Sequence, residues 1–345
     1  MGDTREDFDN LVWDRNDEEW EKTQPKMQQR STIQLVEKLA TEKFGCPTNW
    51  IAPINIGGYN IVYRLRVQSY SSDIIIRRPI RCYAQFPEKK TSIEAATTRY
   101  IEKKTKIPIA SVLFHGQTPE LGHYLIIKYI KHQHSMSTAL NATNNDTDKT
   151  FVLDPNISDD FLEDLYTKVA SSLLGLSQHT FSRIRSLVQS NDGSYSVATR
   201  PITRNMNNML QLAGIPPSIL PPRDKTYETA NEYYTELANM HLAQLAFQQN
   251  DLIISSNDCR NKYVACKIFR RLAKEGKLST FGFKEDNWSA KSLSKTLRTI
   301  PSPAPPNTGS FRLYCDDLRA GNILLDDFND IAAIIDWEFT YAAPS

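Results

Sequence analysis

The sequence lacks any apolar run that approaches the length of a membrane span, although 40% of its 345 residues are hydrophobic. Its net charge at pH 7 is only +1, so charge gives no sequence-wide case for binding nucleic acid or an anionic membrane surface. The first residues, MGDTREDFDN, are acidic and polar, unlike a secretory signal. These absences predict a globular protein with neither a nucleic acid nor a membrane as its partner.

Cysteine is scarce and irregularly placed. The chain has five cysteines, an odd number, and no CxxC pair. This pattern suits neither a disulfide framework nor a zinc site, and it predicts reduced thiols in a cytoplasmic protein. The length allows one large domain or two lobes with a sizeable core.

The segment 311–345, FRLYCDDLRAGNILLDDFNDIAAIIDWEFTYAAPS, holds an acidic pair, Asp316-Asp317. Asn322 lies five residues after Asp317, and Asp336 follows the apolar run 331–335. A kinase needs this order: one carboxylate accepts the proton of an attacking hydroxyl, and an Asn and a second carboxylate hold Mg²⁺ against the ATP phosphates. Oxygen atoms suit this small, hard cation. The alternative is a turn before a strand, with Asp and Asn as loop formers.

The same segment predicts a hairpin. Residues 331–335 must pair with residues 323–325 if Asp336 is to lie near Asn322. Asp316, beside Asp317, is the second candidate for the carboxylate that accepts the proton.

Residues after about Trp50 have the pattern of strands. Runs 54–56 and 61–67 flank the turn 57–60, of sequence GGYN, and the second run alternates as a half-buried strand should. The two glycines suit a tight hairpin. They equally suit a loop over phosphates, because missing side chains let backbone N–H groups approach anionic oxygens. Both interpretations remain open.

A cation and an acid follow this hairpin. Arg77 ends the apolar strand predicted for 73–77, and Glu94 falls in the first turn of a helix predicted for 92–104. Glu94 there favours the helix dipole, or else it pairs with Arg77 and holds the cation over ATP phosphates. Strands are predicted at 110–115 and 124–130.

Helices account for most of the remaining pattern. The pattern of residues 9–44 predicts helical structure that stops at Gly45. Ser31 and Gln34 have the spacing of a capping box within it. The middle of the chain, from Phe161 to about residue 282, is mostly helical in pattern.

Taken in order, these residues resemble the aminoglycoside phosphotransferase and choline kinase-like superfamily, and more narrowly the fungal phosphotransferase-enzyme-family proteins. The matching phrases are LVW, IGGYNIVYRL, IIIRRPI, EAATTRYIEKKTKIPIA, RPITRNMN, NDCRNKYVACKIFRRLA and YCDDLRAGNILL…IIDWEFTYAAPS. They cover nearly the whole chain, and the last is the most specific.

The resemblance implies an α+β, bilobal, protein-kinase-like fold with a small antiparallel-sheet N-lobe and a larger, mostly helical C-lobe. The expected divisions are a helical extension over 1–47, an N-lobe over 48–130 and a C-lobe over 131–345. It also implies an ATP- and Mg²⁺-dependent transfer of the γ-phosphate to a hydroxyl of an unidentified small molecule. The implied roles are catalytic base for Asp317, Mg²⁺ ligands for Asn322 and Asp336, and nucleotide binding for Gly57, Gly58, Asn60, Arg77, Glu94, Lys128, Tyr129 and Ile130.

The sequence departs from the family pattern at three places. Cys315 stands where many relatives have His, and Arg77 stands for the strand lysine, so its charge is spread over a plane. The chain also stops at Ser345, where relatives continue into further helices. We therefore expect a truncated C-lobe with apolar surface left open for self-association.

The sequence bears on two other classes of function. A protein kinase is disfavoured because no APE-like end follows Asp336 and Trp337-Glu338 replaces Phe-Gly. The alternative to an active enzyme is a weak or inactive nucleotide-binding pseudokinase or interaction module. Cys315 and the short C-terminus favour that alternative.

Overall fold

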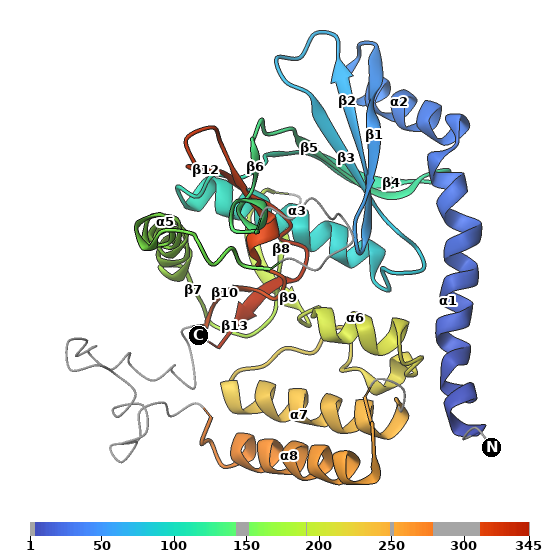
Figure 1. Cartoon of the computed structure of the whole chain (residues 1–345), viewed down its shortest axis with the longest axis vertical. Helices are drawn as coiled ribbons and strands as arrows, with labels where there is room; N and C mark the ends of the chain where they lie inside the picture. The colour runs from blue at the N-terminus through green and yellow to red at the C-terminus, as the bar shows by residue number, and fades with distance from the viewer. Residues whose placement is uncertain (1–3, 143–151, 191, 249–251, 279–310, 345) are drawn as a thin grey trace.

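The computed structural model describes residues 4–142, 152–190, 192–248, 252–278 and 311–344. Figure 1 shows the antiparallel sheet and helix α2 at one end of the long axis, helices α6, α7 and α8 stacked toward the other, and helix α1 running along the side from one end to the other. The α+β class with an antiparallel N-terminal sheet and a helical second part is therefore confirmed. Among the described helices, none is long and apolar enough to cross a membrane.

The N-terminal sheet has five antiparallel strands in the order β1-β2-β3-β5-β4. Their bounds are β1 (Thr48–Ile56), β2 (Asn60–Val67), β3 (Ile74–Pro79), β4 (Val112–Thr118) and β5 (Gly122–Lys128). Alternate residues of β2 are buried, as its sequence predicts. The glycine turn joins β1 to β2, with Asn55 paired to Val62.

Two helices precede this sheet, α1 (Thr4–Gln28) and α2 (Arg30–Phe44). Helix α2 packs Ile33, Val36, Leu39 and Ala40 into the core beneath the sheet. It ends at Gly45 as predicted, with a left-handed φ of 69° that glycine adopts without strain. The predicted capping box is wrong: the N-cap is Gln29, and α1 and α2 almost adjoin, so Ser31 lies inside the second helix.

Helix α3 (Pro87–Lys104) begins five residues before its predicted start. Pro87 occupies the first turn, where a missing N–H costs nothing. Glu94 therefore lies beyond the first turn, and the dipole explanation for it is wrong. Its carboxylate is buried, with the residue only 5% exposed.

The second part contains more strands than predicted. Its helices are α4 (Met136–Ala139), α5 (Asp159–Ser177), α6 (Arg204–Gln211), α7 (Ala230–Phe247) and α8 (Ser256–Lys274), with a 3-10 turn η1 (Pro217–Ile219). The prediction of helix was wrong for β7 (Thr180–Phe181), β8 (Ser186–Gln189) and β9 (Tyr195–Thr199). Gly193, with a φ of 78°, allows the turn between β8 and β9, and β-branched residues flank it. Residues 279–282 of the helical prediction lie outside the described residues.

Two small sheets carry the C-terminal motif. Strand β10 (Phe311–Cys315) lies between β7 and β13 (Thr340–Ala343), while β11 (Ile323–Leu325) lies between β6 (His134–Ser135) and β12 (Ile331–Ile334). The 3-10 turn η2 (Ala320–Asn322) connects the two sheets. The predicted hairpin is confirmed, because β11 and β12 pair with Ile323 opposite Ile334.

Candidate active site

Asp317 lies in the loop between β10 and η2, with 6% of the residue exposed. Two backbone contacts fix this loop: the amide of Asp316 donates to the carbonyl of Phe339 at 3.1 Å, and the side-chain amide of Asn322 donates to the carbonyl of Asp317 at 2.9 Å. The five-residue spacing that the sequence shows thus closes a short ring across the loop. These hydrogen bonds hold the backbone of Asp317 in place, so its carboxylate projects from a fixed position.

Asp336 follows β12 in a left-handed conformation, with a φ of 70°. Asp tolerates this region better than most side chains, although it remains uncommon. The backbone amide of Ile335 donates to the carbonyl of Asn322 at 2.9 Å and brings this turn beside η2. The structure therefore gathers Asp317, Asn322 and Asp336 in one place, as the sequence predicted.

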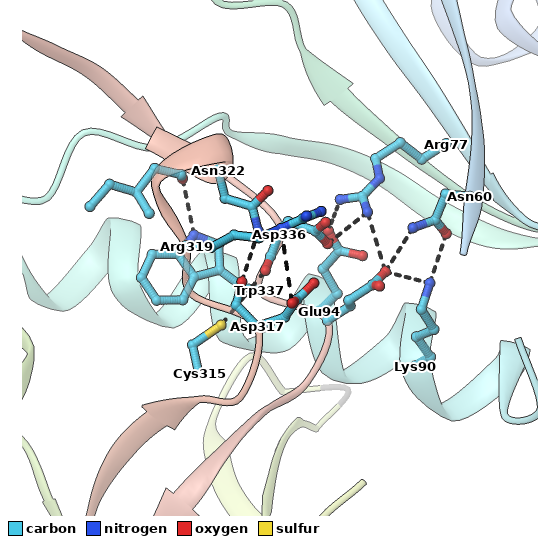
Figure 2. Close-up of polar contacts among 12 residues, drawn as sticks. Asn60, Arg77, Lys90, Glu94, Cys315, Asp317, Arg319, Asn322, Asp336 and Trp337 are labelled. Carbon is cyan, nitrogen blue, oxygen red and sulfur yellow. Dashed lines mark hydrogen bonds and ion pairs between the residues drawn. The ribbon is translucent and has the colours of Figure 1, made fainter. Parts of the chain in front are cut away.

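Cys315 supports the same turn. Its thiol donates to the carbonyl of Asp336 at 3.7 Å, a contact drawn in Figure 2. Burial raises the pKa of this thiol to about 12, so it stays protonated and can donate. Cysteine thus provides a structural hydrogen bond at the position where the sequence departs from the family pattern.

Arg77 joins the sheet to the C-terminal loops. From β3 its guanidinium forms an ion pair with Glu94 on α3, and it donates to Asp336 at 2.8 Å and to Glu338 at 3.2 Å (Figure 2). Arg77 is only 8% exposed. The ion-pair interpretation of Arg77 and Glu94 thus agrees with the geometry.

Sequence reasoning missed two members of this network. Lys90 and Glu338, 1% and 0% exposed, form a buried ion pair. Asn60 bridges them: its amide nitrogen donates to Glu338 at 2.7 Å, and its oxygen accepts from Lys90 at 2.7 Å. Lys90 precedes Glu94 by one helical turn, and Glu338 follows Asp336 by two residues. Both spacings can be read in the sequence, but a sequence does not show whether a charged side chain is buried or solvated.

The network holds three carboxylates against two cations. Glu94, Asp336 and Glu338 have oxygens within 4.8 Å of one another, and Arg77 and Lys90 neutralise only part of this charge. Burial, opposed by Arg77, raises the pKa of Glu94 to about 7. Burial and then Asp336 raise the pKa of Glu338. Burial also disfavours the ionised form of Asp336, but the positive charges of Arg77 and Lys90 have the larger combined effect. The pKa of Asp336 is therefore lowered. The cluster therefore favours the ionised form at Asp336 and disfavours it at Glu94 and Glu338.

A cavity of about 810 Å³ lies against these groups. Of the residues predicted to bind nucleotide or catalyse transfer, it is lined by Gly57, Gly58, Asn60, Arg77, Lys128, Tyr129, Ile130, Asp317 and Asp336. Glu94 and Asn322 do not line it, but each contacts a residue that does. The predicted site residues are thus brought together from both parts of the fold.

The glycine turn forms part of the cavity wall. The Gly57 amide donates to the Asn60 carbonyl at 2.8 Å and closes the hairpin. A Cβ on Gly57 would lie an ordinary 3.4 Å from that carbonyl, and one on Gly58 would meet open space. Backbone geometry therefore does not demand glycine here. The missing side chains instead keep the wall open, which agrees with the phosphate-loop alternative.

Residues 128–130, the connector that follows β5, also line the cavity. The Tyr129 amide donates to the Asp73 carbonyl at 3.0 Å, and the Arg64 guanidinium lies 3.8 Å from the centroid of the Tyr129 ring. These contacts fix the connector to the sheet.

Helix α6 also contributes to the wall of the cavity and was not singled out from the sequence as a site element. Arg204, its first residue, donates from its guanidinium to Asp317 at 2.8 Å and from its backbone amide to Asp316 at 2.9 Å. The Tyr59 hydroxyl donates to Asn208 at 3.1 Å and ties the glycine turn to the same helix.

No protein-family model matches the chain, and no curated protein matches it in sequence. Among solved structures it is similar to a complex of aminoglycoside phosphotransferase APH(4)-Ia with ADP and hygromycin B, at 15% identity over 90% of this chain and 73% of that one, with a TM-score of 0.45. The GDP and kanamycin complex of APH(2")-IIIa has 10% identity over 89% and 73%, with a TM-score of 0.44. A candidate fructosamine-3-kinase from Haemophilus somnus 129PT has 11% identity over 89% and 72%, with a TM-score of 0.46.

These three structures are of two aminoglycoside phosphotransferases and a candidate fructosamine-3-kinase. With identities of 15% or less and TM-scores of 0.46 or less, they carry no conclusion about the chemistry of this chain. The case for function rests on the residues around the cavity.

Proposed function

We propose that the chain is an ATP- and Mg²⁺-dependent phosphotransferase that moves the γ-phosphate to a hydroxyl of a small molecule. One observation carries this proposal: the same cavity is lined by the open glycine turn, by Arg77 and by Asp317. Phosphoryl transfer depends mainly on positioning and on neutralising charge, and these groups supply both.

Each residue has a role in this proposal. Asp317 accepts the proton of the acceptor hydroxyl, because it is the carboxylate that lines the cavity beside the loop fixed by Asn322. Arg77 binds phosphate oxygens, and Glu94 holds its guanidinium in place. The Gly57–Gly58 wall gives the phosphates room, and residues 128–130 face the rest of the nucleotide.

The site has the ligands that Mg²⁺ prefers. The amide nitrogen of Asn322 is committed to Asp317, which leaves the amide oxygen as its ligand atom. Asp336 adds a carboxylate whose pKa is lowered, so it is charged at neutral pH. A further buried carboxylate oxygen, Oε1 of Glu338, has no hydrogen-bond partner within the described part of the chain. When bound there, Mg²⁺ would neutralise phosphate charge, and Asn322 and Asp336 would hold it.

Transfer from labelled ATP tests the proposal. The purified chain is incubated with ATP carrying ¹⁸O in its γ-phosphoryl group, Mg²⁺ and a protein-free metabolite extract. Mass spectrometry should find a product that gains the labelled phosphoryl group, and Asp317→Asn should abolish the gain. Absence of any labelled product would refute the proposal.

One observation favours the alternative function, a nucleotide-binding module without transfer. The Arg204 guanidinium pairs with Asp317, the group that would accept the proton. The same experiment separates the two: Mg²⁺-dependent ATP binding with no labelled product from any extract would support the binding module.

A further inference from the structure

The acceptor end of the cavity, defined here by Tyr59, Tyr83, Arg204, Asn208, Gln211 and Leu212, carries an unusual arrangement of charge. Arg204 donates to the Asp317 carboxylate at 2.8 Å, and 50% of its side chain remains exposed. A second guanidinium, that of Arg319, lies 3.9 Å from the same carboxylate and is 65% exposed. Both arginines line the cavity, so their free donors face any molecule that enters.

The carboxylates of this cavity offset these cations only in part. Three carboxylates line it among the described residues, and two of them, Asp336 and Glu338, bind Arg77. Asp317 contacts both Arg204 and Arg319, and the charge of Arg319 also acts on Asp336. One carboxylate is thus shared directly by two guanidinium groups. The carboxylate of Asp316 accepts a hydrogen bond from the backbone amide of Arg204, but Asp316 does not line the cavity.

We infer that the acceptor is an anionic hydroxylated molecule, with a carboxylate or phosphate group that binds Arg204; this rests on the proposed phosphotransferase function. Guanidinium groups bind carboxylate and phosphate through two parallel hydrogen bonds, and like charges placed together are strongly unfavourable. A polycationic acceptor is thus disfavoured at this end.

The same pairing explains how the base becomes available. While Arg204 holds Asp317, a carboxylate oxygen is occupied by a donor. An anionic group that binds Arg204 competes for that donor and frees the oxygen to face the acceptor hydroxyl. The hydroxyl proton then passes to Asp317, the acceptor oxygen forms a bond to the γ-phosphorus, and the bond to the oxygen bridging to the β-phosphate breaks. ADP leaves with that electron pair.

Separation of acceptors by charge tests the inference. A protein-free metabolite extract is divided by ion exchange into anionic, neutral and cationic fractions, and each is incubated with the chain, Mg²⁺ and ¹⁸O-labelled ATP. Labelled product should form from the anionic fraction. Product from the neutral or cationic fraction alone would overturn the inference and keep the phosphotransferase. No product from any fraction would refute the proposed function and the inference with it.

Substitution at Arg204 tests the residue itself. With the anionic acceptor so found, Arg204→Gln should raise the acceptor KM about 10- to 100-fold, because a charge-assisted hydrogen bond is lost, and should leave the ATP KM unchanged. Arg204→Lys should recover part of the loss, since the charge returns without the fork. Arg271→Gln, which removes an arginine 77% exposed on α8, is the matched control. An unchanged acceptor KM in Arg204→Gln would overturn the assignment of this residue.

Discussion

Arg77 and Asp336 lie 259 residues apart in the sequence, yet the guanidinium of one donates to the carboxylate of the other at 2.8 Å. The contact joins the central strand β3 to the turn after β12, and it links the two parts of the fold at the wall of the cavity. Because Arg77 also binds Glu94 and Glu338, one buried cation holds carboxylates from a helix and a loop together.

Asp317→Asn should keep the fold and ATP binding and lower phosphoryl transfer about 10²- to 10⁴-fold, the usual contribution of a positioned base. Asn keeps the shape of the side chain but cannot accept the proton. Steady-state transfer and ATP binding are measured together. Asp316→Asn is the matched control and should retain most activity, since Asp316 does not line the cavity. If instead Asp316→Asn loses phosphoryl transfer and Asp317→Asn retains it, Asp316 is the base.

Asp336→Asn should weaken nucleotide binding in the presence of Mg²⁺ more than binding in its absence, because the hard cation loses a charged ligand. Asn suits the left-handed φ of 70° at this position, so the variant tests charge and not backbone strain. Calorimetric titrations with and without Mg²⁺ measure the difference. A Mg²⁺ dependence equal to wild type would remove Asp336 from the metal site.

Arg77→Gln should raise the ATP requirement and lower the free energy of unfolding by about 3–5 kcal/mol, because it leaves buried carboxylates unpaired. Glu94→Gln should have a milder effect, since Arg77 keeps Asp336 and Glu338. The two effects should be non-additive in a double-mutant cycle measured by denaturant unfolding and ATP titration. Additive effects would mean that Glu94 does not position Arg77.

The pKa of Glu94, raised by burial from 4.5 to about 7, gives a pH dependence of stability. Between these values the folded chain binds more protons at this group than the unfolded chain does. This contribution to stability is therefore fully present below about pH 4.5 and is lost as the pH rises through about 7. We expect the melting temperature of wild type, relative to that of Glu94→Gln, to fall from pH 5 to pH 8. A constant difference over this range would contradict the raised pKa.

Exposed apolar side chains on α8 predict self-association. Tyr263, Val264 and Ile268 are 50%, 52% and 53% exposed, and the last two lie one helical turn apart. Light scattering should show a mass that increases with concentration in wild type and less so in the double variant Val264→Gln, Ile268→Gln. Arg271→Gln on the same helix serves as the control. A monomeric wild type at all concentrations would contradict the expectation.

The sequence alone determined the local parts of this protein. The alternation of 61–67 predicted β2, Gly45 predicted the end of α2, and the apolar runs around 323–334 predicted the hairpin of β11 and β12. These features depend on neighbours close in the chain, where periodicity and turn chemistry suffice. The spacing of Asp317 and Asn322 predicted a functional loop for the same reason.

Other features were decided only by the tertiary structure. Lys90, Glu338 and Arg204 look like ordinary surface charges in the sequence, and only packing buries the first two and places the third on Asp317. The start of α3 was misplaced as well: the helix begins at Pro87, and several of its charged and polar residues, among them Lys90 and Glu94, are buried. Contacts across more than a hundred residues set these outcomes, because desolvation of a charge depends on everything packed around it, and no local pattern encodes that surrounding.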